Sequence, residues 1–196
     1  TTMKKSFRST MIDTIMENAE IYPNMVVLNA DSARALKLTD FQAAYPDRMF
    51  GVGISEADLI GTAAGMATTG LIPVVVGFSM FVSEKPFEQI RQAIAYPNLN
   101  VKIIATHSGL CVGQDGATHQ ALEDMAVIRT LPNFKVFAAA DVTETKAAVS
   151  AMLKHNGPAY LRLGRDLAED IFSGSKEFIP GGADLLANGS DVTIAA

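Results

Sequence analysis

A glycine-bracketed polar loop and a histidine that precedes it are the residues of this sequence best suited to chemistry. Residues 113–120 read Gly-Gln-Asp-Gly-Ala-Thr-His-Gln, and His107 follows an apolar run over 101–106. That run has the length and β-branched content of a buried strand, so His107 and the loop are expected at its end, where open α/β sheets bind ligands. The two glycines allow the loop to bring the carboxylate of Asp115 and the imidazole of His119 into roughly the same space.

The same loop also has a purely structural interpretation. Asp and Gly are common in turns for reasons unrelated to function, and Thr118 could cap a helix that runs from His119 to about Arg129. The residues alone support the two interpretations about equally.

A second candidate is a glutamate at the start of a helix of small residues. Residues 55–58 read Ser-Glu-Ala-Asp, which has the arrangement of a capping box and places Glu56 in the first helical turn. The helix dipole favours an acid there, so stability alone could explain this residue. The helix continues through Gly61 and Gly65, and a glycine inside a helix costs about 1 kcal/mol relative to alanine. Such a slim helix is suited to close contact with another helix, another subunit or a flat ligand.

Short apolar runs that alternate with helical patterns must position these residues. The expected strands are 25–30, 72–76, 101–106, 136–139 and 160–163. The expected helices are 8–20, 55–69, 87–95, 120–129 and 143–155. Parallel strands need crossover connections, so this alternation predicts a three-layer α/β/α fold with a mainly parallel sheet.

Composition restricts the class of protein. The chain has 196 residues, of which 48% are hydrophobic and 19% are charged, as expected for an ordered globular domain. The net charge of -5 and the lack of a basic stripe argue against nucleic acid or an anionic membrane surface as a partner. A single cysteine, Cys111, excludes an intrachain disulfide and a multi-cysteine metal site. The longest apolar stretch, 71–82, is too short to span a bilayer, and we expect a cytoplasmic protein.

The pattern of elements also predicts how the chain is divided. Residues 1–172 are expected to form one domain, and the Gly, Ser, Lys and Pro residues after it mark 173–190 as a linker. An apolar strand begins at 191, and a terminal strand needs a neighbour to pair with. We therefore expect 191–196 to be the start of a truncated C-terminal domain.

Several motifs, in this order along the chain, resemble the pyrimidine-binding domain of transketolase. They are Arg-Met-Phe-Gly-Val-Gly-Ile-Ser-Glu at 48–56, Thr-His-Ser-Gly at 106–109 and the loop at 113–120. The resemblance extends over residues 5–165. It implies a thiamine-diphosphate-binding fold. It also implies a transferase of carbohydrate metabolism, as in the pentose phosphate pathway. Such an enzyme moves a two-carbon ketol unit from a ketose phosphate to an aldose phosphate.

The resemblance assigns cofactor contacts to several residues. Glu56 matches the glutamate that hydrogen-bonds N1′ of the aminopyrimidine, which promotes removal of the thiazolium C2 proton. Phe78 and Phe81 match aromatic residues that pack on the ring, although aromatics in an apolar run are more often core residues. Asp31 matches an aspartate near the cofactor, and it could equally be a helix cap.

The resemblance also assigns a substrate channel. His107 and His119 match catalytic histidines that bind donor hydroxyls and move protons, and Asp115 matches a residue that holds a donor hydroxyl. Arg8 and Arg165 match residues that bind the substrate phosphate, for which a guanidinium is well shaped. Arg8 fits a solvated helix face equally well.

The sequence departs from the family pattern at several positions. Gln114 stands where an acid is usual, and Glu84 stands where a tyrosine is common. The charge of Glu84 must therefore point elsewhere or the edge of the pocket must differ, and Phe87 could supply the missing aromatic surface. Residues 32–35, which read Ser-Ala-Arg-Ala, do not place a serine at the position that many members use to bind the substrate phosphate.

The motif that holds Mg²⁺ in this superfamily, Gly-Asp-Gly followed by asparagine, is absent from the sequence. We therefore expect thiamine diphosphate to bind in a site shared with a separate diphosphate-binding, N-terminal transketolase subunit, which would hold the Mg²⁺. The expected assembly is a heterotetramer around a homodimer-like core, with the helix of Glu56 at the contact. The alternatives are a subunit like deoxyxylulose-phosphate synthase, one like the beta subunit of 2-oxo acid dehydrogenases, or a non-catalytic interaction domain.

Overall fold

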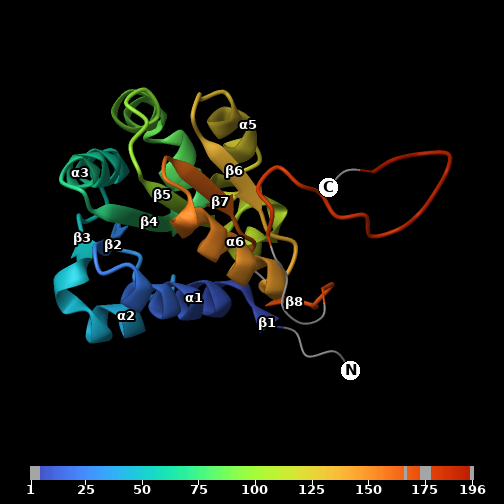
Figure 1. Ribbon diagram of the computed structural model, residues 1–196, viewed down its shortest axis with the longest axis horizontal. Helices are drawn as coiled ribbons and strands as arrows, with labels where there is room; N and C mark the ends of the chain where they lie inside the picture. The colour runs from blue at the N-terminus through green and yellow to red at the C-terminus, as the bar shows by residue number, and fades with distance from the viewer. Residues whose placement is uncertain (1–4, 166, 173–177, 195–196) are drawn as a thin grey trace.

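Six parallel strands form the centre of the computed structural model (Figure 1), which describes residues 5–165, 167–172 and 178–194. The strand order is β3-β2-β4-β5-β7-β6, and every neighbouring pair is parallel. The strands are β2 Met25–Asn29, β3 Met49–Gly51, β4 Ile72–Phe78, β5 Lys102–Thr106, β6 Lys135–Ala138 and β7 Ala159–Arg162.

Helices cover both faces of this sheet (Figure 1). One face packs against α1 Phe7–Ile21, α2 Thr39–Ala44 and α6 Val142–Lys154. The other packs against α3 Glu56–Thr68, α5 Asp124–Arg129, the π-helix η2 Met80–Glu84, the short helix α4 Phe87–Gln89 and the π-helix η3 Ile90–Ala95. Short 3-10 helices occupy Pro46–Arg48 (η1), Gly109–Asp115 (η4) and Ala117–His119 (η5).

The central strands are apolar throughout because both of their faces are buried. In β2, Val27 points into the core on the α1 and α6 side, whereas Val26 and Leu28 point into the core on the α3 side. This alternation produces two hydrophobic cores, one on each side of the sheet. The three-layer α/β/α fold predicted from the sequence is therefore confirmed.

The helix expected over 120–129 is shorter than predicted. It begins only at Asp124, because Ala121 is held in a bridge with Ser108 and its carbonyl accepts a hydrogen bond from the backbone N–H of Gly109. The helix expected over 87–95 is three residues of α-helix followed by a π-helix. Ser55 is the N-cap of α3 as predicted, but its side chain makes no capping hydrogen bond.

Two features near the chain ends differ from the sequence-based expectation. An antiparallel pair of short strands, β1 Lys5–Ser6 and β8 Leu167–Ala168, was not predicted. The strand expected from 191 is absent over 191–194, which are exposed, and residues 195–196 lie outside the described part. Residues 178–190, within the expected linker, contain no helix or strand, and 173–177 also lie outside the described part. The division into domain, linker and further domain stays a prediction.

Within the described residues, no helix combines the length and the apolar character that crossing a membrane requires.

Candidate functional site

Four neighbouring strands of the sheet deliver the candidate residues to one edge. Asp31 follows β2, Phe78 ends β4, His107 follows β5 and Arg165 follows β7. These strands are adjacent and parallel, so their carboxyl ends lie side by side. Open α/β sheets bind ligands at this edge.

Two phenylalanines and two histidines form one cluster of rings at this edge. The ring centroids of Phe78 and His107 are 4.1 Å apart, and Phe81 meets His119 edge-on at 5.1 Å. Phe78 also lies 6.3 Å from Phe81 and 6.4 Å from His119. Residues from β4, η2, η5 and the loop after β5 therefore present a partly exposed aromatic surface next to two imidazoles.

His107 is held in a strained and buried position. Its backbone has a φ of 57°, a left-handed conformation that is rare for residues other than glycine, and its side chain is largely hidden from solvent. The hydroxyl Oγ1 of Thr106 lies 2.8 Å from Nδ1 of the imidazole and fixes the orientation of the ring. Burial, followed by the positive charges of Arg8 and Arg165, lowers the pKa of His107 to about 4. The ring is therefore neutral at pH 7 and can both donate and accept a hydrogen bond.

The glycine-bracketed loop folds back toward this histidine. Gly113 and Gly116 both have positive φ, which allows two short 3-10 segments to meet at a sharp bend. The bend places the carboxylate of Asp115 3.6 Å from Nη1 of Arg165. Nδ1 of His119 lies 2.9 Å from the hydroxyl of Thr118, so Thr118 orients this ring and does not cap a helix.

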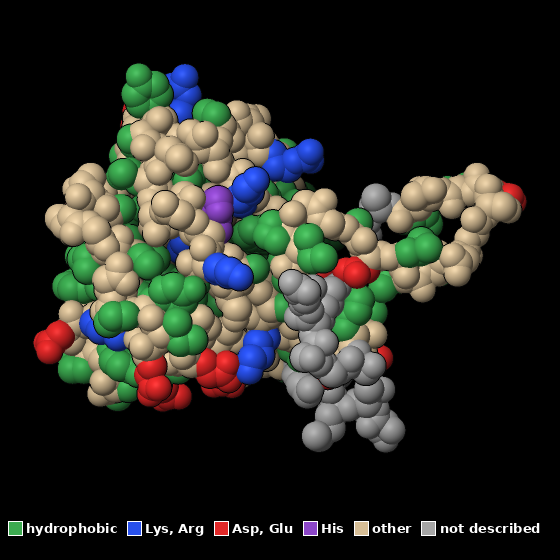
Figure 2. Space-filling view, viewed as in Figure 1, with side chains coloured by type: hydrophobic (Ala, Val, Ile, Leu, Met, Phe, Trp, Pro, Cys, Tyr) green, Lys and Arg blue, Asp and Glu red, His purple; other side chains and the backbone are tan. Residues whose placement is uncertain are grey.

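Arg8 and Arg165 line the same cavity, although one is in α1 and the other follows β7. The cavity has a volume of about 390 Å³, and Cys111 and Gln114 also line it. A guanidinium nitrogen of Arg8 donates to the carbonyl of Ala35 at 2.8 Å, and Arg165 donates to the carbonyl of Val112. Figure 2 shows histidine surface next to Lys and Arg side chains on one face of the molecule. The cavity is thus suited to an anion.

Glu56 is buried at the first position of α3, with only 5% of its surface exposed. Nζ of Lys85 lies 2.5 Å from its carboxylate oxygen Oε2. Lys85 follows directly after η2, the π-helix that carries Phe81, and η2 packs against α3. The buried acid and the ring cluster therefore belong to adjoining elements. On the opposite side of α3, Gly61 and Gly65 are exposed, with open space where a Cβ would be.

Other candidates lie apart from this cluster. Asp31 is exposed, with a left-handed φ of 55°, and within the described residues it makes no hydrogen bond or ion pair with another candidate. It is not a helix cap, because Leu38 is the N-cap of α2. Phe87 packs against the hydrophobic core on the α3 side and does not join the ring cluster.

Glu84 faces two acids of the segment that leads into α5. Burial, followed by the charges of Glu123 and Asp124, raises its pKa above the ordinary value. Glu84 therefore lies near two acids at the start of α5, whereas the neighbouring Lys85 pairs with Glu56.

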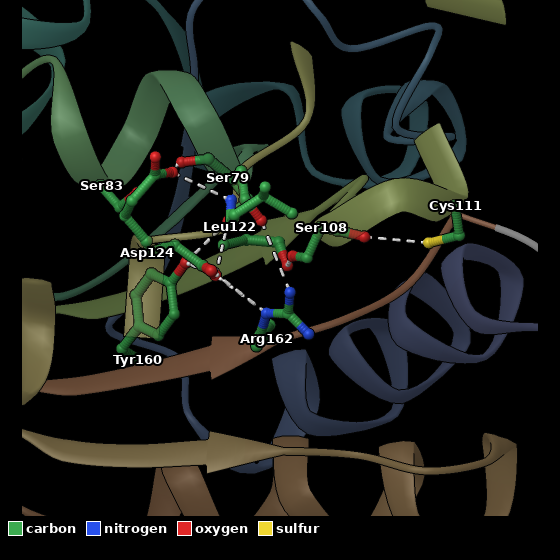
Figure 3. Close-up of polar contacts among 11 residues, drawn as sticks. Ser79, Ser83, Ser108, Cys111, Leu122, Asp124, Tyr160 and Arg162 are labelled. Carbon is green, nitrogen blue, oxygen red and sulfur yellow. Dashed lines mark hydrogen bonds and ion pairs between the residues drawn. The ribbon is translucent and has the colours of Figure 1, made fainter. Parts of the chain in front are cut away.

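A buried polar network under the site was not predicted from the sequence. Asp124 accepts hydrogen bonds from Ser79, Tyr160 and Arg162 (Figure 3). One signal was available, because Asp124 precedes the buried Ile128 by one helical turn and so lies on the apolar face of its helix. Lys85 was also missed as a site residue, and its partner could not be identified from sequence spacing.

The described part of the chain contains no group of three or more His, Cys, Asp or Glu side chains placed to hold a metal ion. What it does contain is a buried acid at the start of α3 and a half-buried aromatic ring, Phe81, on the adjoining η2, next to Phe78 at the end of β4. That arrangement fits a flat, nitrogen-containing ring.

The sequence matches the family "Transketolase, pyrimidine binding domain" over residues 3–170. The chain belongs to the transketolase family. It is 42% identical over 194 residues to a Methanocaldococcus jannaschii protein provisionally named a transketolase C-terminal section, covering 98% of this chain and 61% of that protein. It is 38% identical over 189 residues to a 6-deoxy-6-sulfo-D-fructose transketolase subunit of a Clostridium species, covering 96% of this chain and 59% of that protein.

A solved structure described as a split gene transketolase, inactive beta4 tetramer, has the same fold as this transketolase domain. The TM-score is 0.85 at 41% sequence identity, and the alignment covers 95% of this chain and 60% of that one. The chain thus spans about 60% of the length of these relatives. Their shared architecture corresponds to the pyrimidine-binding part of a transketolase C-terminal section.

Proposed function

We propose that this chain forms the pyrimidine-binding half of a split transketolase, which transfers a two-carbon ketol unit from a ketose donor to an aldose acceptor. The observation that carries the proposal is the burial of Glu56 at the start of α3, next to the helix that bears Phe81. Family membership supports this reaction class, and the buried acid would supply the carboxyl group that the reaction requires.

Thiamine diphosphate, when bound, supplies the carbon nucleophile that attacks a ketose carbonyl. Glu56 would share a proton with the pyrimidine nitrogen, and its burial strengthens that hydrogen bond because water is excluded. Phe81 and Phe78 would pack against the ring face. Asp31, which is exposed after β2, would contribute least to the cofactor site.

His107 and His119 would handle the substrate hydroxyls. His107 is neutral at pH 7, so one ring nitrogen donates a hydrogen bond and the other accepts one. His119 packs against Phe81 and can give or take a proton at a sugar oxygen. Asp115 would accept a hydrogen bond from a donor hydroxyl, while its ion pair with Arg165 connects the hydroxyl end of the site to the cationic cavity.

Arg8 and Arg165 would bind the anionic end of the sugar. Two guanidinium groups on one cavity favour a phosphate or another tetrahedral oxyanion. Relatives of this chain carry the names of transketolase subunits for 6-deoxy-6-sulfo-D-fructose and for apulose-4-phosphate. Both names describe sugars with a tetrahedral anion, which is consistent with this cavity.

The diphosphate and Mg²⁺ would be held by a partner chain. Within the described residues no metal-binding cluster is present, and the split-gene structure is of a beta chain. The exposed surface of α3 at Gly61 and Gly65 would allow another backbone to approach closely. We propose a complex of two such chains and two diphosphate-binding subunits.

The test is ketol transfer by the complex of this chain with its diphosphate-binding partner, thiamine diphosphate and Mg²⁺. Glu56→Gln should reduce kcat by about 100-fold or more. Asp58→Asn is the matched control, because Asp58 lies in the same helical turn and is exposed. Unchanged activity in the Glu56 variant would remove this residue from its role, and an inactive wild-type complex would favour the interaction domain. Turnover with pyruvate in place of a ketose donor would favour a synthase-like or dehydrogenase-like enzyme.

A further inference from the structure

A fully buried carboxylate lies under the site and joins three separate segments of the chain. Asp124 has no exposed surface and accepts hydrogen bonds from Ser79 Oγ at 2.8 Å, Tyr160 OH at 2.8 Å and Arg162 Nε at 3.1 Å. Figure 3 shows these side chains converging on Asp124 from different elements. Three donors compensate for the loss of water around this buried carboxylate, because each hydrogen bond replaces one to water.

Two of these donors are fixed by the sheet. Tyr160 and Arg162 are both in β7, whose backbone is paired with β5 and β6. Burial and the charge of Asp124 raise the pKa of Tyr160 well above its usual value, so its hydroxyl keeps its proton and donates it. The strand therefore provides a rigid base for Asp124.

The third donor belongs to the segment that carries Phe81. Ser79 is the N-cap residue of η2, and Phe81 follows it by two positions. The backbone carbonyl of Ser79 also accepts a hydrogen bond from the hydroxyl of Ser83, 2.6 Å away within the same π-helix. Asp124 thus holds the first turn of η2 at a fixed place relative to β7.

The same acid is close in sequence to His119. Asp124 begins α5, and Ala121 lies between it and His119. Arg162 donates to the carbonyl of Ala121 at 3.5 Å as well as to Asp124. Phe81 and His119 meet edge-on at 5.1 Å, and they lie on the two segments that Asp124 joins.

We propose that Asp124 is a positioning residue that sets the spacing between Phe81 and His119 by holding Ser79 on one side and the segment before α5 on the other. Its hydrogen bonds in the described part of the chain go to Ser79, Tyr160 and Arg162, and not to His119. The role in turnover rests on the function proposed above, whereas the effect on the Phe81–His119 geometry does not.

The first measurement is made on the full chain without cofactor, by NMR at constant pH. The ring current of Phe81 affects the chemical shift of the His119 ring protons, and Phe81→Leu defines the shift without it. Asp124→Asn and Ser79→Ala should both move the His119 shift toward the Phe81→Leu value. Ser79→Ala leaves Asp124 with two donors, so it tests the proposal if the Asp124 variant does not fold.

Asp141→Asn is the matched control. Asp141 is another fully buried aspartate at the start of a helix, and it accepts hydrogen bonds from the backbone N–H groups of Glu144, Ile171 and Phe172, away from the ring cluster. This variant should lose stability without moving the His119 shift. Wild-type shifts in both Asp124→Asn and Ser79→Ala would overturn the proposal.

The second measurement is ketol transfer by the complex with the partner chain. Asp124→Asn and Ser79→Ala should lower kcat by about 10- to 100-fold, with a smaller change in the KM of the sugar, because catalytic groups are misplaced while the anion cavity is intact. A change in KM alone would contradict the positioning role in turnover. If the NMR shifts move as expected but the wild-type complex shows no ketol transfer, the proposed function fails and the structural coupling stands.

Discussion

Nζ of Lys85 lies 2.5 Å from the buried carboxylate of Glu56, and the two residues come from different elements on the same side of the sheet. Glu56 is the group proposed to face the pyrimidine ring. In this structure the ammonium group of Lys85 is paired with the Oε2 oxygen of Glu56. Binding of a ring nitrogen at that oxygen therefore requires Lys85 to move, and its half-exposed side chain has room to do so.

This ion pair gives a prediction about stability. Lys85→Met should lower the free energy of unfolding by about 1–2 kcal/mol, because it leaves the Glu56 carboxylate buried without a cation. The control is Lys146→Met, since Lys146 pairs with Glu17 at 2.9 Å with both side chains exposed. Lys146→Met should lower the free energy of unfolding by less than about 1 kcal/mol. Urea unfolding of both variants measures the difference, and equal effects would show that the Glu56 pair behaves as an ordinary surface pair.

The histidine at the end of β5 predicts a dependence of stability on pH. The pKa of His107 is lowered to about 4 in the folded chain, whereas an unfolded histidine titrates near ~6.5. Between these values the unfolded state binds more protons, so stability rises with pH, by at most about 1.4 kcal/mol per pH unit. The stabilising contribution of the neutral His107 ring is fully present above the pKa of the unfolded state. It is lost as the pH falls through the pKa of the folded state.

His107→Asn should flatten this part of the curve, as measured by urea unfolding at several pH values from acid to neutral. His155 also has a lowered pKa through burial, so His155→Asn serves to separate the two contributions. An NMR titration in which the His107 ring takes up its proton near neutral pH would contradict the prediction.

The cationic cavity predicts selectivity for anionic sugars. Arg165→Gln should raise the KM of a phosphorylated acceptor by about 10- to 100-fold, because a hydrogen bond to a charged group contributes about 1.5–3 kcal/mol. The KM of the corresponding free aldose should change little. Arg8→Gln, which removes the other guanidinium that lines the cavity, should have the same selective effect.

Arg91→Gln provides the control for this pair, because Arg91 is exposed on η3 and does not line the cavity. Steady-state kinetics of the complex with both acceptors measures the selectivity. Equal rises in KM for phosphorylated and free acceptors would show that the two arginines stabilise the loop at 113–120 and do not bind the phosphate.

The main elements could be predicted because their signals are local. The runs over 25–30 and 101–106 are apolar because strands in the middle of a parallel sheet are covered on both faces, and the structure has strands at these places. The start of α3 was also marked locally, by a polar residue and two acids in its first turn.

Prediction failed where distant residues compete with a local signal. Residues 120–123 have helical character, but Ala121 is paired with Ser108, and the helix starts later. The antiparallel pair of Lys5–Ser6 with Leu167–Ala168 joins the two ends of the domain. Neither two-residue segment is long enough to show the alternating pattern of a strand. Such pairings depend on the whole fold, which no short window of sequence contains.

The sequence by itself determined which chemical groups this protein has and which strand each of them follows. Both could be predicted because the apolar pattern that marks a strand is formed by neighbouring residues. Only the tertiary structure decided which groups meet. Ser79 and Asp124 are 45 residues apart, and Lys85 and Glu56 are 29 apart, yet each pair is in hydrogen-bond contact. These contacts depend on how the helices pack on the sheet, and that packing is set by the sum of many weak interactions over the whole core.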